Sequence, residues 1–159
     1  MSLKRFGLFS YTDTHNLGDE IQSIAARQFL PRVDYYLDRE HLSTFFPPKG
    51  ESVALIMNAW YSHHPENWPP SENVVPLLIA MHITQAPSYR SGLSATEFML
   101  KGPAASYLKA LGPVGARDLP TLELLQQHGI ESYFSGCMTL TLSRPSDAER
   151  DENLVVANE

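Results

Sequence analysis

Short apolar runs alternate along this chain with segments of helical periodicity. This alternation limits the possible folds more than any other feature of the sequence. Residues 5–11 predict a first buried strand. A polar loop follows, and then Ile21, Ile24, Ala25 and Phe29 recur at helical spacing. A strand, a loop and a helix, repeated along one chain, predict a Rossmann-like α/β fold. Its sheet is expected to be mostly parallel, with helices on both faces.

The later segments continue the same pattern. Residues 52–60 are nearly all apolar and predict a strand covered on both faces. A Gly-Pro pair at 102–103 divides the helix expected over residues 96–111 into two pieces. The remaining expected strands cover residues 33–37, 76–83, 113–117 and 132–134.

The helix expected over residues 119–128 has clear boundary signals. Asp118 is suited to cap its first turn, where Pro120 costs no hydrogen bond. Gly129 fits the left-handed position that often follows a helix, and Ile130 is then placed to contact Leu125. These signals predict a helix that ends in a Schellman motif.

Residues 1–142 are expected to form one Rossmann-like domain. Residues 143–153 are polar and charged, as in an interdomain linker. Residues 154–159 begin with a new apolar run, which predicts either the start of a missing second domain or an edge strand of the same sheet. If a second domain is absent, an exposed apolar face at residues 154–157 favours a homodimer.

Composition excludes several classes of function. The net charge of -6 disfavours nonspecific binding to nucleic acid or anionic lipid. Cys137 is the single cysteine, so an intramolecular disulfide and a zinc site built from several cysteines are both excluded. No integral membrane segment is expected, since no run approaches about 18 apolar residues, and we expect a cytoplasmic protein. Neither a metal nor a cofactor is assigned, because no nucleotide-binding fingerprint and no helical histidine pair occurs.

Candidate site residues lie where strands end, because ligands bind at the carboxyl edge of open α/β sheets. After the first strand, Asn16 and Gln22 can exchange hydrogen bonds with hydroxyl groups, and Gly18 allows close backbone approach. Asp19 is a candidate for proton transfer. The alternative is structural: Asn16 or Asp19 caps the helix, and Gly18 only makes the turn.

Three further strand ends supply candidates. Arg117 can bind a carboxylate or phosphate, while Asp118 can orient it or cap the next helix. His82 is a candidate general base, with a hydrogen-bonded structural histidine as the alternative. Gly136 and Thr139 follow the strand at residues 132–134 and are expected to face a ligand.

Two other kinds of residue suggest chemistry without deciding it. Cys137 is more typical of a buried small apolar residue than of a nucleophile, since the sequence indicates no helix N-terminus or basic neighbour that would lower its pKa. Trp60 and Trp68 border a loop rich in proline and histidine. Their rings can stack on sugars or simply pin the loop in place.

Three segments together resemble the polysaccharide pyruvyl transferase family, including its ExoV-like members. They are residues 16–22 (NLGDEIQ), residues 115–121 with the following His-Gly-Ile at 128–130, and residues 133–142. The resemblance covers the chain up to residue 142. It implies the amino-terminal half of a fold similar to the two-domain GT-B glycosyltransferases.

The resemblance also implies an activity. Members transfer pyruvate from phosphoenolpyruvate to a sugar of an exopolysaccharide or cell-surface glycan, including lipid-linked acceptors. Because the second half is thought to supply much of the donor pocket, we expect this chain alone to be weak or inactive. Two other classes stay open: a non-catalytic carbohydrate-binding or assembly module, and a sugar-nucleotide glycosyltransferase of the same architecture.

Overall fold

The expected α/β fold is confirmed in a computed structural model that describes residues 5–12, 14–48, 51–61 and 63–143. Four strands, β1 (Arg5–Ser10), β2 (Tyr35–Asp38), β3 (Val53–Ile56) and β4 (Val74–Leu77), form a parallel sheet in the order β2-β1-β3-β4. The chain moves outward from β1 to β2 and then returns to the other side of β1 to form β3. A topological switch point therefore lies between β1 and β3.

A second parallel pair, β5 (Val114–Ala116) and β6 (Ser132–Phe134), continues the sheet beyond β4. The link is made by Met81, whose N–H donates to the carbonyl of Gly115 and whose carbonyl accepts from the N–H of Arg117. The strand expected over residues 76–83 is interrupted at Ala80, which has a φ of 53°. A Cβ on Gly115 would lie 3.1 Å from the Cα of Ile79, so glycine permits the two backbones to approach this closely.

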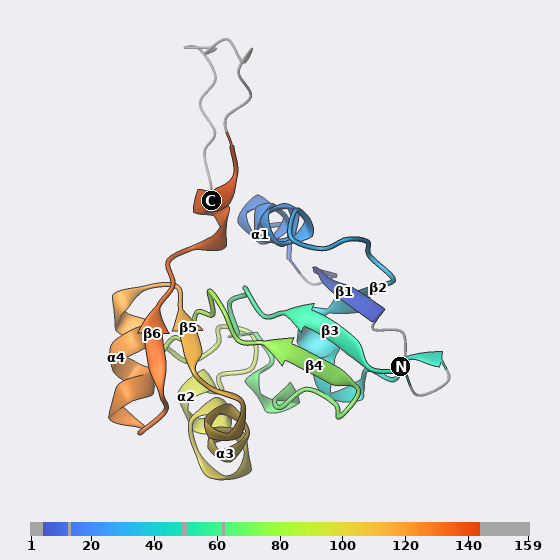
Figure 1. The fold of residues 1–159 in the computed structure, drawn as a ribbon. Helices are drawn as coiled ribbons and strands as arrows, with labels where there is room; N and C mark the ends of the chain where they lie inside the picture. The colour runs from blue at the N-terminus through green and yellow to red at the C-terminus, as the bar shows by residue number, and fades with distance from the viewer. Residues whose placement is uncertain (1–4, 13, 49–50, 62, 144–159) are drawn as a thin grey trace.

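The two faces of the sheet are covered unequally. Along a strand successive side chains alternate between faces, so Leu8 packs with α1 (Leu17–Arg27) while Phe9 packs into the opposite core. Figure 1 shows α1 on one side of the sheet and α2 (Ala95–Met99) and α3 (Gly102–Leu111) on the other. The 3-10 turn η4 (Met138–Thr141) accompanies α1. The larger core is formed with η1 (Arg39–Thr44), η3 (Pro65–Asn67), α2, α3 and α4 (Leu119–Gln127).

The predicted boundary signals of α4 are confirmed. Asp118 caps the helix by accepting a hydrogen bond from the N–H of Thr121 at 2.9 Å. Gly129 has a φ of 65°, and the N–H of Ile130 donates to the carbonyl of Leu125 at 3.0 Å. The predicted division of the preceding helix at Gly102 is also found.

The described part of the chain ends at residue 143. The linker expected over residues 143–153 therefore lies almost wholly outside the described residues, as does the apolar run at 154–159. Within the described ranges, every helix is too short or too polar to cross a bilayer.

Candidate functional site

The residues that follow the strands gather at the carboxyl edge of the sheet. Tyr11 follows β1, Arg39 follows β2, and Asn58 lies just past β3. His82 and Arg117 reach the same edge from the segments after β4 and β5, which pair side by side. This edge, at and beside the topological switch point, is where an open α/β sheet binds its ligands.

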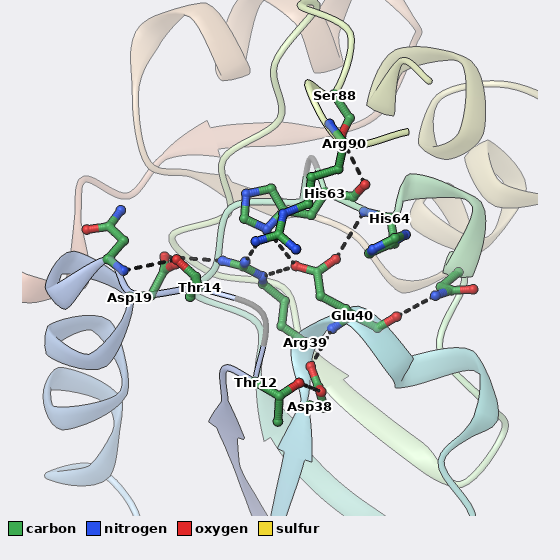
Figure 2. A network of polar contacts seen from close by, with 12 residues as sticks. Thr12, Thr14, Asp19, Asp38, Arg39, Glu40, His63, His64, Ser88 and Arg90 are labelled. Atoms are coloured by element: carbon green, nitrogen blue, oxygen red, sulfur yellow. Dashed lines mark hydrogen bonds and ion pairs between the residues drawn. The ribbon is translucent and has the colours of Figure 1, made fainter. Parts of the chain in front are cut away.

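A buried ion network occupies one part of this edge (Figure 2). We use that name for Asp19, Arg39, Glu40 and His63, each of which is at most 6% exposed. The Nε of Arg39 donates to Oε1 of Glu40 at 2.7 Å, and its Nη1 lies 3.1 Å from Oδ1 of Asp19. The second contact lacks hydrogen-bond geometry and is therefore an ion pair only.

Two neighbouring carboxylates keep Arg39 charged in this buried position. Burial alone would lower the pKa of Arg39, but the charges of Glu40 and Asp19 raise it above its ordinary value. The guanidinium also lies over the ring of Tyr11, 5.0 Å from the ring centroid. Burial in turn raises the pKa of Tyr11 to about 12, so this hydroxyl stays protonated at neutral pH.

His63 extends the buried ion network to the loop before α2. The Nη2 of Arg39 donates to its Nδ1 at 3.0 Å, so the neutral ring carries its proton on Nε2. Burial, followed by the charge of Arg39, lowers the pKa of His63. Ser88 donates through its hydroxyl to the carbonyl of His63 at 3.0 Å, and the ring of Tyr89 lies 5.5 Å away. The network therefore holds the loop around Ser88 against the sheet edge.

The His82–Asp118 pair is the more open polar group at this edge. The Nδ1 of His82 is hydrogen-bonded to Oδ2 of Asp118, and the two side chains are 23% and 31% exposed. Burial raises the pKa of Asp118, but the bonds from Thr121 and His82 outweigh it and lower that pKa. Since the carboxylate accepts at Nδ1, a neutral His82 presents its lone pair at Nε2, which bonds to no other described residue.

Trp60 connects the two groups. Its ring lies 5.5 Å from that of His63 and 6.0 Å from that of His82, in both cases edge to face. The backbone N–H of His82 also donates to the carbonyl of Ala59 at 3.0 Å. The indole of Trp60 therefore packs between the two histidines, a position that also fits the pinning role considered for it.

Cys137 lies beside two predicted site residues and is half-buried, with its thiol hydrogen-bonded. The amide of Gln22 donates to its Sγ at 3.1 Å, and the hydroxyl of Thr139 lies 3.0 Å from the same atom. Burial raises the pKa of the thiol, but these hydrogen bonds and the charge of Arg117 lower it overall. The expectation that no basic neighbour lowers this pKa was wrong, because the charge of Arg117, which follows β5, contributes to the lowering.

The remaining predicted residues divide between capping and lining. Asn16 caps α1, since its Oδ1 accepts from the N–H of Gly18 at 2.9 Å, and a Cβ on Gly18 would lie 3.0 Å from that oxygen. Gly136 has a φ of 73° and lines a hollow of about 260 Å³ together with Cys137. Asp118 combines both roles considered for it, because it caps α4 and also binds His82.

Asp19 and Arg117 differ in access. Asp19 gives one oxygen to Arg39, and its Oδ2 is buried without a hydrogen-bond partner among the described residues. Arg117 is 24% exposed, and its Nε lies 3.8 Å from Oδ2 of Asp118. Arg117 therefore lies at the open part of the edge, while Asp19 belongs to the buried ion network.

Sequence reasoning missed Arg39 and Glu40. Both follow the strand at residues 33–37 almost directly, as Arg117 and Asp118 follow a later strand, so the same positional signal was present. No group of three or more histidine, cysteine, aspartate or glutamate side chains in the described part of the chain is arranged to hold a metal ion.

Comparison of this chain with protein-family models, with curated proteins and with solved structures found no match in any of the three. The function proposed below therefore depends on the resemblance of sequence motifs and on the geometry of the carboxyl edge.

Proposed function

We propose that this chain is the acceptor-binding half of a polysaccharide pyruvyl transferase-like protein. The reaction is transfer of pyruvate from phosphoenolpyruvate to a saccharide, free or lipid-linked, in the cytoplasm. The observation that supports it best is the His82–Asp118 pair, a histidine held by a carboxylate at Nδ1 with Nε2 unoccupied by the described residues. Such a histidine is suited to take a proton from a sugar hydroxyl.

The chemistry needs two proton transfers that balance. One sugar hydroxyl bonds through its oxygen to C2 of phosphoenolpyruvate and loses its proton, while C3 gains a proton and becomes a methyl group. A second hydroxyl of the same sugar then displaces phosphate from C2 and gives up its own proton, which leaves with the phosphate. In this scheme Nε2 of His82 takes the proton of the attacking hydroxyl, and Asp118 stabilises the imidazolium that forms.

Arg117 supplies the positive charge in this proposal. Its guanidinium is partly exposed beside the His82–Asp118 pair, where a planar fork can bind the pyruvyl carboxylate or the phosphate. Asn16, Gly18, Gln22, Gly136 and Thr139 are kept as acceptor-side residues. Asp19 contributes by holding Arg39 and hence the shape of the edge.

The test measures ketal formation and phosphate release with phosphoenolpyruvate and oligosaccharide acceptors. It uses the 159-residue chain and any longer product of its gene. In whichever form is active, we expect His82→Gln to lower kcat by about 10²- to 10⁴-fold, the usual contribution of a general base. His128→Gln is the matched control, because among the described residues His128 bonds only at the end of α4, where its Nδ1 donates to the carbonyl of Leu124.

Two results would count against the proposal. Equal activity of His82→Gln and His128→Gln would remove His82 from the chemistry. Saccharide binding without ketal formation, if it persists after Arg117→Ala in every form of the protein, would instead support a carbohydrate-binding module. Binding of a nucleotide-sugar but not of phosphoenolpyruvate would indicate a glycosyltransferase.

A further inference from the structure

Helix α1 has its apolar side on the outside. Its buried residues are Asp19, Gln22, Ser23, Ala25 and Ala26. Leu17, Ile21 and Ile24, at helical spacings of four and three, are 64%, 42% and 59% exposed. A surface helix normally turns such a stripe toward the core.

The polar side of α1 is turned inward for a reason that the site supplies. Asp19 reaches Arg39, and Gln22 reaches Cys137, so both inward contacts serve the carboxyl edge. The small residues Ala25 and Ala26 let the helix pack closely on Leu8 and Ile56. The apolar stripe is then left facing away from the sheet.

The face of the sheet that carries α1 is also incompletely covered. Beside α1 lies a hollow of about 350 Å³, lined in part by Leu8, Ile24 and Tyr36, with Tyr36 itself 69% exposed. The hollow of about 260 Å³ near Cys137 lies on the same face, where Phe29 and Leu77 are 55% and 56% exposed. Apolar surface grouped in this way is typical of an interaction site.

Two charges on α1 indicate what covers this surface. Glu20 lies in the first turn and Arg27 in the last, and both line the same hollow together with Ile24. They are seven residues apart, which places them on one flank of the helix. Arg27 donates one N–H to the carbonyl of Leu30, and a guanidinium has further N–H groups that can donate to a partner.

We propose that α1 is the interface of a symmetric homodimer, in which the α1 helices of two copies pack antiparallel across a two-fold axis near Ile24. In that arrangement Glu20 of each copy faces Arg27 of the other, whereas parallel packing would bring like charges together. The apolar stripe of one copy enters the hollow beside Ile24 of its partner. A two-fold interface must be complementary to itself. This surface meets that condition, because it carries both the acidic and the basic residue and both the apolar stripe and the hollow. The inference does not depend on the proposed chemistry.

The first test is the oligomeric state of the intact 159-residue chain by analytical ultracentrifugation across micromolar to submillimolar concentration. We expect a monomer–dimer equilibrium. Ile24→Glu is expected to raise the dissociation constant by at least about 30-fold, the effect of losing one strong interface contact of about 2 kcal/mol. Leu119→Glu is the matched control, because Leu119 is 58% exposed, like Ile24, but lies on α4.

Charge exchange tests the antiparallel arrangement separately. Glu20→Arg alone is expected to weaken the dimer by about tenfold, as is Arg27→Glu, because each brings like charges together. The double variant Glu20→Arg/Arg27→Glu restores opposite charges and is expected to return the dissociation constant to within about threefold of the original. Circular dichroism and thermal unfolding of each variant show that the fold is kept.

Cross-linking gives a measurement that does not depend on weakening the dimer. In a Cys137→Ser background, Ile24→Cys should form a disulfide-linked dimer on mild oxidation, and Leu119→Cys should not. A wild-type chain that stays monomeric at every concentration would overturn the proposal. So would a dimer that Ile24→Glu and Leu119→Glu weaken equally, or one in which the double charge variant is no tighter than the single variants.

Discussion

The buried ion network and the His82–Asp118 pair lie at the same edge of one sheet and are built from the same kinds of residue. Each contains a histidine whose Nδ1 is held by a charged partner: Arg39 for His63 and Asp118 for His82. They differ in access to solvent. His63 is 3% exposed, whereas the side chain of His82 is 23% exposed. Burial, more than residue type, therefore separates the two groups: the buried ion network is closed to solvent, and the His82–Asp118 pair is open to it.

The difference follows from where the partners come from. The buried ion network joins α1, η1 and the loop after β3, so it is closed over by the elements that it connects. The His82–Asp118 pair joins two neighbouring strand ends, and the ring of Trp60 packs against His82. A network that ties elements together should matter for stability, and a pair at a strand end should matter mainly for chemistry. Single substitutions in each group can test that division.

Loss of Arg39 should have the largest effect. Arg39→Met leaves the carboxylates of Asp19 and Glu40 buried without their cation, and we expect the free energy of unfolding to fall by about 3–5 kcal/mol. Urea unfolding followed by circular dichroism measures it. Lys101→Met is the control, because the side chain of Lys101 is 61% exposed and pairs only at 3.9 Å with Glu97. A loss of less than 1 kcal/mol would mean that the buried ion network is not what holds this edge.

The second prediction concerns pH and His63. Its folded pKa lies below the ordinary value of 6.5, so between these two pKa values the unfolded chain binds more protons than the folded one. The contribution of His63 to the free energy of unfolding is therefore fully present above about pH 6.5. It falls with decreasing pH toward the folded pKa, by up to about 1.4 kcal/mol per pH unit. His63→Gln should reduce the dependence of the unfolding free energy on pH in this window. An unchanged slope in that variant would assign the pH dependence to other groups.

Asp118 should contribute less than Arg39 to the free energy of unfolding, and it should do so by capping α4. Asp118→Ala removes the acceptor for the N–H of Thr121, and we expect unfolding to become easier by about 1 kcal/mol. The matched control is Ser94→Ala, because Ser94 precedes α2 without making a side-chain capping bond. The comparison is made by thermal unfolding at neutral pH. If the two variants lose equal stability, the capping contact of Asp118 has no special weight.

Local signals made part of this molecule predictable. The boundaries of α4 depend on Asp118, Pro120 and Gly129, all within twelve residues, and each acts locally: Asp118 through a side-chain hydrogen bond, and Pro120 and Gly129 through their backbones. The break at Gly102 is local in the same sense. The alternation of apolar runs also predicted the parallel sheet. The strand expected over residues 76–83 is divided, because the backbone turns at Ala80, so that β4 pairs with β3 and Met81 pairs with β5.

Contacts between distant segments were less predictable. Arg39 and His63 are 24 residues apart, and their contact depends on how η1 packs against the loop after β3. Periodicity predicted a helix around Ile21 and Ile24, but its apolar stripe, which would ordinarily face the core, is exposed. The inward contacts of Asp19 and Gln22 accompany this orientation, and their partners lie in the segments that follow β2 and β6. The lowered pKa of Cys137 also depends on distant segments, since Gln22 and Arg117 both contribute to it.

Arg117 should have the smallest effect on stability, which makes it the sharpest test of the comparison. Its ion pair with Asp118 spans 3.8 Å between partly exposed side chains, so Arg117→Gln should change the free energy of unfolding by less than about 0.5 kcal/mol. Its charge should still be felt nearby, because it helps to lower the pKa of Cys137. We therefore expect the pH midpoint of Cys137 alkylation to rise in Arg117→Gln and to stay unchanged in Lys109→Gln, a variant on α3. A large loss of stability in Arg117→Gln would mean that Arg117, like Arg39, holds the fold together, and the contrast between the two groups would fail.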